Sequence, residues 1–368
     1  MSIILFGAVP IAFAALAIYE ESKLGLLGFD FKGTIWHPGR EILAGHSPYP
    51  LPVASELNTG NPSVYPPFAL LLGLPFALLP LGVSYWFWVA ALVVAVLATL
   101  RILGIRDWRC YAIALGSCPV AFGLALGNIV ILLLPFMAYA WRHRERTSSG
   151  LALALAIALK LVLWPLLVWL LALRRGRAAV LAAGGAAVVT LAAWAVIGFN
   201  GFRDYPRLLS VNDAVYGSHS WSLVAGGVGI GLPLSAARLL AALLGLGLLV
   251  LSLVLARRPD GDRRSFTLAV VASIALLPVV WPASLAVLVV PLALAASSTD
   301  RVWLFFAGLW IAAAVPRVIS HPVDRPHGVP ALVWQMQHSP PPTAQIAVFA
   351  LLIASMTVAF LRLGRPRT

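Results

Sequence analysis

Residues 28–68 read GFDFKGTIWHPGREILAGHSPYPLPVASELNTGNPSVYPPF and separate two apolar runs. The stretch carries chemically active side chains of several kinds, which are Asp30, Lys32, His37, Arg40, Glu41, His46 and Glu56. Pro38 and Gly45 enclose a segment with the signals of a helix start and a helix end, so we expect a short helix here, followed by proline-rich turns. We interpret the stretch as a folded loop outside the membrane that holds half of an active site.

On both sides of this loop the chain is apolar. It is 61% hydrophobic and only 11% charged, whereas soluble domains have about 25% charged residues. Runs of about 20 apolar residues recur, and each is long enough to cross a bilayer. Runs such as residues 178–199 are continuous rather than alternating, which argues against an outer-membrane barrel. The composition predicts an all-α polytopic membrane protein that forms a single domain over residues 1–368.

The hydrophobic pattern predicts about 12 transmembrane helices, with a count of about ten as the alternative. The predicted spans are residues 3–19, 67–81, 84–103, 111–126, 129–141, 150–173, 178–199, 235–256, 266–280, 284–296, 302–319 and 344–361. The first span lacks a basic start and a small-residue cleavage site, so it is expected to be retained. With a cytoplasmic N-terminus, this order puts residues 21–66, 200–222 and 320–343 outside the cell membrane. Six of the seven histidines fall in these segments.

The net charge of +13 is explained by topology. Basic residues gather at span ends, as the positive-inside rule requires, and this excludes nucleic acid as the main partner. Two basic turns, residues 101–109 and 142–146, fall on the outer side in the twelve-span order. They indicate either a re-entrant helix or a local exception to the rule. Cys110 and Cys118 make no disulfide or zinc framework, and no metal or cofactor is predicted.

Asp30 is the candidate catalytic residue of the loop. It follows the first predicted span, and the neighbouring Phe29 and Phe31 limit the access of water. A carboxylate in this place can accept a proton as a general base. The alternative is a solvated acid that caps a helix, and the competing carboxylates are Glu41 and Glu56.

Several cations are candidates for binding a phosphate. Lys160 lies inside a predicted span, where a charged side chain is costly and marks a functional site. The alternative is a lysine that extends to the membrane surface. Arg203, Arg207 and His219 in the second outer segment can also neutralise a phosphate, or they can form a plain rim beside the membrane. No phosphate-binding loop, HExxH or Ser-His-Asp pattern is recognisable, and no segment reads as a nucleotide-binding βαβ unit.

The order of these motifs resembles a known family. Asp30 is followed by a short helix that ends in Leu43-Ala44-Gly45 with Tyr49, and then by Tyr65-Pro66-Pro67 at the start of the next apolar run. Residues 124–142, LALGNIVILLLPFMAYAWR, contain Asn128, and residues 150–168, GLALALAIALKLVLWPLLV, contain Lys160. Together these features resemble the polyprenyl-phosphate-sugar-dependent glycosyltransferases of family 87, including actinobacterial mannosyl- and arabinofuranosyltransferases. Residues 276–294 match a further family segment at Trp281 but lack its histidine.

The resemblance implies a GT-C fold with a large first extracytoplasmic loop, in the plasma membrane. It implies transfer of a sugar, with mannose as the first candidate, from a polyprenyl-phosphate donor to a glycolipid or lipoglycan acceptor, with inversion at the anomeric carbon. Asp30 would be the general base, and Lys160, Arg203, Arg207 and His219 would bind the donor phosphate. The remaining substrate contacts would be Lys32, His37, Arg40, Tyr49, Tyr65, Asn128 and Trp281.

Three alternatives stay open at this point. An arabinofuranosyl donor fits the same family. A transporter or flippase of lipid-linked sugars would carry polar residues in the middle of several spans, whereas only Lys160 is clear here. A non-catalytic scaffold protein would not depend on Asp30.

Overall fold

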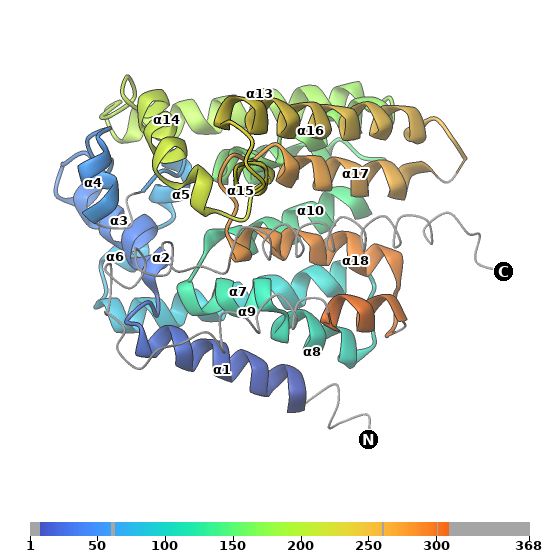
Figure 1. The fold of residues 1–368 in the computed structure, drawn as a ribbon, viewed down its shortest axis with the longest axis horizontal. Helices are drawn as coiled ribbons and strands as arrows, with labels where there is room; N and C mark the ends of the chain where they lie inside the picture. Colours follow the sequence, from blue (N-terminus) through green and yellow to red (C-terminus); the bar gives the residue numbers. More distant parts are fainter. Residues whose placement is uncertain (1–7, 60–62, 260, 300, 309–368) are drawn as a thin grey trace.

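The computed structural model describes residues 8–59, 63–259, 261–299 and 301–308, and the described part contains helices but no strand (Figure 1). The first half contains α1 (Val9–Lys23), α2 (Phe29–Phe31), η2 (Lys32–Trp36), α3 (His37–Leu43), α4 (Ala54–Thr59), α5 (Pro67–Leu71), α6 (Leu74–Ala77), α7 (Leu81–Ile102), α8 (Trp108–Gly116), α9 (Cys118–Leu126), η3 (Ile129–Leu132), α10 (Leu133–Arg142), α11 (Ser148–Leu159), η4 (Leu161–Leu163) and α12 (Pro165–Ala172). The second half contains α13 (Gly176–Val196), α14 (Tyr205–Tyr216), η5 (Gly217–His219), α15 (Leu223–Gly229), α16 (Leu234–Ala256), α17 (Gly261–Ala275), η6 (Pro282–Leu288) and α18 (Val289–Ala295).

Three described helices, α7, α13 and α16, are long and apolar enough to cross a membrane. The pair α8 and α9, bent by 60°, gives a fourth candidate span, and shorter apolar helices pack between these. The all-helical membrane class is therefore confirmed, while the count of about 12 spans stays a prediction. The predicted span 344–361 and the outer segment 320–343 lie outside the described residues, and so does most of the predicted span 302–319.

The predicted span at residues 67–81 is wrong. The structure has two short helices there, α5 and α6, of five and four residues. Pro67 and Pro75 stand at their starts, and Pro80 precedes α7, so the prolines divide the apolar run. Both helices pack with α3 at the end of the bundle that holds the polar loop (Figure 1).

The predicted single span at residues 150–173 is also wrong. α11 ends at Leu159, Lys160 has an extended backbone with φ −156° and ψ 118°, and α12 begins at Pro165. Arg175, which follows α12, forms an ion pair with Glu145, which precedes α11. A straight helix of this length would separate the two by about 45 Å. The segment is therefore a re-entrant hairpin with Lys160 at its tip.

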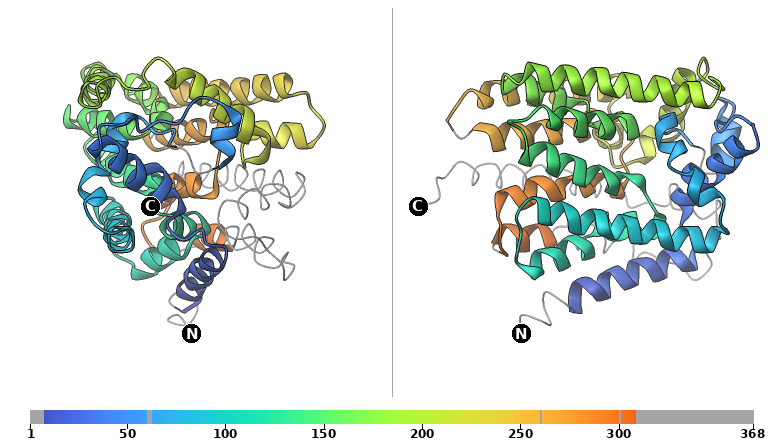
Figure 2. Two further views of the ribbon diagram at one scale, coloured as in Figure 1. Left: turned by 90° about the vertical axis from the view of Figure 1, so that its left-hand side faces the viewer. Right: turned by 180° about the vertical axis from the view of Figure 1, so that it is seen from behind.

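These two corrections explain the basic turns that conflict with the twelve-span order. Arg144, between α10 and α11, pairs with Asp262 at 2.9 Å, and Asp107, before α8, accepts a hydrogen bond from the Thr299 backbone at 2.9 Å. The turns after α7, α10, α12 and α16 lie at one end of the bundle, and α2–α6 with α14 lie at the other end (Figures 1 and 2). The positive-inside rule therefore needs no exception among the described turns.

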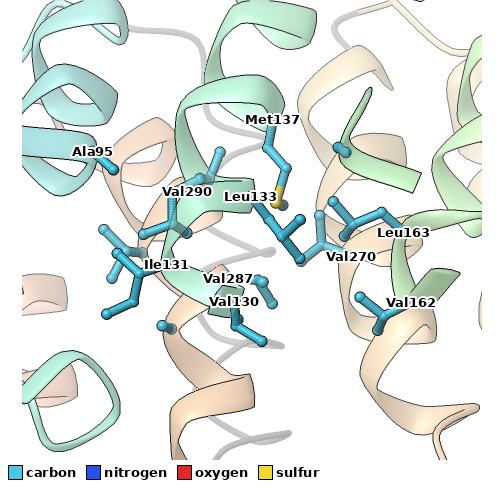
Figure 3. Packing of buried hydrophobic residues seen from close by; sticks show 14 of the residues in the cluster. Ala95, Val130, Ile131, Leu133, Met137, Val162, Leu163, Val270, Val287 and Val290 are labelled. Carbon is cyan, nitrogen blue, oxygen red and sulfur yellow. The ribbon is translucent and has the colours of Figure 1, made fainter. Parts of the chain in front are cut away.

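The core lies between the short helices. Val130, Val162 and Val287, which lie in η3, η4 and η6, meet in one cluster with Leu163 and Val270 (Figure 3). All five side chains are at least nine-tenths buried. The breaks are therefore supported from one side by a tightly packed apolar layer.

Candidate active site

Two polar residues stand at helix breaks on the loop side of this core. Gly127 closes α9 in the left-handed conformation, with φ 71°, and the Asn128 N–H donates back to Gly123 O at 2.7 Å. This is the common glycine-closed helix end. Lys160 stands at the tip of the α11–α12 hairpin, where a cation also benefits from the negative end of α11.

Asp30 meets the first of these breaks. The Asn128 Nδ2 donates a hydrogen bond to Asp30 Oδ2 at 2.6 Å, although 98 positions separate the two residues in sequence. Asn128 is 4% exposed, and Asp30 is partly buried. A hydrogen bond to an ionised group in such a place is stronger than one between neutral groups.

The segment that carries Asp30 is fixed to the end of α9 by its backbone. The Gly28 N–H donates to Ala125 O at 2.8 Å, and the Tyr85 hydroxyl donates to the same oxygen at 2.9 Å. The Trp88 indole donates to Gly127 O at 2.8 Å. A Cβ on Gly127 would lie 2.7 Å from the Phe31 Cβ, so this position requires glycine for space as well as for its φ.

Tyr65 and Lys160 complete the cluster around Asp30. The Tyr65 side chain makes hydrogen bonds with the side chains of Thr34 and Asn128 and interacts electrostatically with Asp30. Burial, and then the nearby Asp30 charge, raise the pKa of Tyr65, so its phenol stays neutral. The Lys160 Nζ lies 5.0 Å from the centre of the Tyr65 ring and interacts electrostatically with Asp30. We call these five residues the Asp30 cluster: Asp30, Thr34, Tyr65, Asn128 and Lys160.

Tyrosine hydroxyls hold the chain that leads to Tyr65. Tyr49 donates to Tyr65 O at 2.9 Å, Tyr205 donates to Val64 O at 2.9 Å, and Tyr216 donates to Leu57 O. Tyr205 and Tyr216 belong to α14, which therefore ties the second polar segment to the first.

We expect Tyr205→Phe to weaken this link. The variant keeps the ring, which packs against Tyr49, but leaves Val64 O without this donor. A lost hydrogen bond of this kind costs about 0.5–1.5 kcal/mol, so the melting temperature of the purified protein should fall slightly. The matched control is Tyr19→Phe, because Tyr19 is exposed on α1. An unchanged melting temperature for Tyr205→Phe would show that the link adds no stability.

The structure does not bring every predicted site residue to this cluster. Lys32, His37 and Arg40 are exposed on η2 and α3, where Arg40 stacks on Trp36 and His37 lies 3.8 Å from Glu41. Tyr49 is buried, and its hydroxyl donates a hydrogen bond to the loop backbone at Tyr65 O.

Two of the predicted cations of the second polar segment, Arg203 and Arg207, lie at a surface. Arg203, in the turn before α14, and Arg207, in its first turn, are both exposed, and His219 lies in η5. Trp281 caps η6 and contacts the Tyr216 ring at 6.1 Å between ring centres. Among Lys160, Arg203 and Arg207, the structure therefore places Lys160 with Asp30.

Sequence reasoning did not identify Thr34. Its hydroxyl donates to Asp30 O at 2.6 Å and also reaches Tyr65. The signal was present in the spacing, because residues four apart lie on one face of a helix. A threonine four positions after a candidate base is a candidate neighbour of that base.

The Asp30 cluster is a carboxylate, an ammonium group and neutral donors brought together by broken helices, at one end of an apolar bundle. The described residues hold no group of three or more His, Cys, Asp or Glu side chains that suits a metal ion. The chain is thus a helical membrane protein with a polar site at the loop end of its helices.

The defining pattern of glycosyltransferase family 87 matches residues 64–282, which is more than half of the chain. The chain therefore belongs to glycosyltransferase family 87, as the motif order predicts, and it is a membrane glycosyltransferase. Neither a curated protein nor a solved structure matches the chain significantly. The match contains Tyr65, Asn128 and Lys160, while Asp30 precedes it.

Proposed function

We propose that the protein transfers a mannosyl residue from a polyprenyl-phosphate donor to a glycolipid or lipoglycan hydroxyl, on the extracytoplasmic face of the plasma membrane. Asp30 acts as general base and accepts the proton of the acceptor hydroxyl. That oxygen attacks the anomeric carbon while the bond to the phosphate breaks, which inverts the configuration. The polyprenyl phosphate leaves with the electron pair of the broken bond.

The observation that carries this proposal is the convergence of Asp30 and Lys160 in one cluster. A hydroxyl is a weak nucleophile, so a nearby base increases its reactivity. A departing phosphate gains negative charge, so a fixed cation stabilises the transition state. The chain offers both groups, from elements 130 positions apart, beside the aromatic ring of Tyr65.

The outer side is supported by the separation of charges along the bundle. The basic turns lie at the end away from the Asp30 cluster (Figure 1). Cytoplasmic turns are rich in Lys and Arg, so this end faces the cytoplasm and the cluster faces outward.

We expect cysteines placed at Ser55 and Ser218 to react with a membrane-impermeant maleimide from outside intact cells. Both side chains are exposed, on α4 and η5. The matched control is Ser148→Cys at the start of α11, which should react only after the membrane is opened. Labelling of Ser55→Cys from the cytoplasmic side alone would overturn the placement of the site. Ser339, in the predicted outer segment 320–343, is expected to react in the same way, and it lies outside the described residues.

The activity itself is tested with purified protein in vesicles. Polyprenyl-phosphate mannose labelled in the sugar should lose label to a lipid acceptor, and polyprenyl-phosphate arabinose run in parallel tests the second candidate donor. Transfer from arabinose alone would replace mannose in the proposal. Movement of the intact donor across the bilayer without transfer would favour a flippase.

A further inference from the structure

We propose that Asn128 is a positioning residue, which orients the Asp30 carboxylate and holds it in its ionised form. This differs from the substrate contact expected from sequence. The proposal rests on the proposed role of Asp30 as the base of the transfer reaction.

The direction of the Asn128 amide is fixed by two of its partners, Val130 and Asp30. Its Oδ1 accepts the Val130 N–H at 3.0 Å and thereby caps η3, while its Nδ2 donates to Asp30 Oδ2 at 2.6 Å. Oxygen and nitrogen of an amide are assigned from such networks. The reverse orientation would set the NH₂ group against the Val130 N–H and the oxygen against the carboxylate. One orientation alone satisfies both neighbours.

The backbone leaves this amide little freedom to move. Asn128 follows the glycine-closed end of α9, and the Asp30 segment is hydrogen-bonded to the same end through Gly28 and Ala125. Val130 on the other side is 1% exposed within the apolar core. The donor and the carboxylate are thus held by one rigid turn, and a base that keeps one orientation reacts more readily with a bound hydroxyl.

Three side chains that interact with Asp30 approach it from different elements, and two of them, Tyr65 and Lys160, are titratable. Asn128 approaches from the α9–η3 turn as a neutral donor, Tyr65 from the segment before α5 as a neutral phenol, and Lys160 from the hairpin tip as a cation. Lys160 is also needed by the donor phosphate in the proposed function. Asn128 supplies Asp30 with a hydrogen bond from within the protein, without any substrate.

The decisive variant is Asn128→Asp. Aspartate caps a helix as well as asparagine does, so the contact with Val130 is kept. The donor to Asp30, however, becomes a second carboxylate, and two adjacent carboxylates share a proton. We expect kcat to fall at least tenfold at pH 7, with little change in KM, and to recover partly as the pH rises. Asn200→Asp, at an exposed position after α13, is the matched control.

A second variant, Asn128→Ser, keeps a capping hydroxyl but is too short to reach Asp30. Removing a donor from an ionised carboxylate favours its protonation, so the acidic limb of the pH profile should move up by about one unit. Infrared difference spectroscopy reads the same protonation without any substrate. Its carboxyl band is assigned to Asp30 by its loss in Asp30→Asn.

If both Asn128 variants have the same pH profile and the same carboxyl band as the wild type, the proposal is overturned and Asn128 is only a helix cap. Unfolding of both variants would also overturn it, by assigning Asn128 to the stability of the turn. If the wild-type protein transfers no sugar but the carboxyl band shifts as expected, the proposed function fails while the positioning role stands.

Discussion

Asp30→Asn should reduce glycosyl transfer by about 10²–10⁴-fold, because general-base catalysis contributes that much. The variant removes the group that accepts the proton and keeps its size. An asparagine oxygen can still accept the hydrogen bond from Asn128, which measures 2.6 Å in the wild type, so α2 should remain in place on α9. The measurement is the initial rate of label transfer in vesicles, with the melting temperature as the test of folding.

The matched control is Glu41→Gln in the same loop. Glu41 lies on the loop surface, where it pairs with the exposed His46 at 3.1 Å. Such exposed pairs contribute little to stability, so this variant should keep near-normal transfer. If Asp30→Asn retains normal turnover while Glu41→Gln loses it, the base is Glu41 and the assignment of Asp30 is wrong.

Much of the site could be predicted from single residues. Asp30 stands out in the sequence as an acid after an apolar span. Tyr65 and Asn128 belong to two of the family motifs, and Lys160 is a cation in an apolar run. Their proximity was not visible, because it depends on which helices end at the same depth. The hydrogen bond between Asp30 and Asn128 follows from the glycine-closed end of α9, and sequence shows the glycine but not its partner.

The spans that were predicted wrongly have a common cause. An apolar run of 24 residues has the same hydropathy whether it crosses the membrane once or turns back at its middle. In residues 150–173 the turn is made by the extended backbone of Lys160 and by Pro165. The conflict of two basic turns with the positive-inside rule was the signal that a span in this order was misplaced, and a re-entrant helix was one of its two explanations.

Two of the predicted phosphate ligands, Arg203 and Arg207, lie at the surface. Arg203 and Arg207 were predicted, together with Lys160 and His219, as cations that neutralise the donor phosphate. Their exposure shows that a segment can lie at the correct end of the bundle without pointing into the site. Composition predicts which end of a helix a residue occupies, and packing decides which face it takes.

Lys160→Gln should therefore be the most damaging of the predicted phosphate-ligand variants. The lysine stands in the Asp30 cluster, 5.0 Å from the Tyr65 ring centre, and a charge-assisted contact of this kind is worth about 1.5–3 kcal/mol. Since about 1.4 kcal/mol corresponds to a tenfold change, transfer should fall by about 10–150-fold.

The loss in Lys160→Gln should appear mainly in kcat. The phosphate gains charge as the glycosidic bond breaks, so the lysine stabilises the transition state more than the bound donor. Arg177→Gln removes one charge from an exposed position at the opposite end of the bundle and should leave kcat unchanged. Normal turnover in Lys160→Gln, together with a loss in Arg203→Gln or Arg207→Gln, would move the phosphate site to the surface of α14.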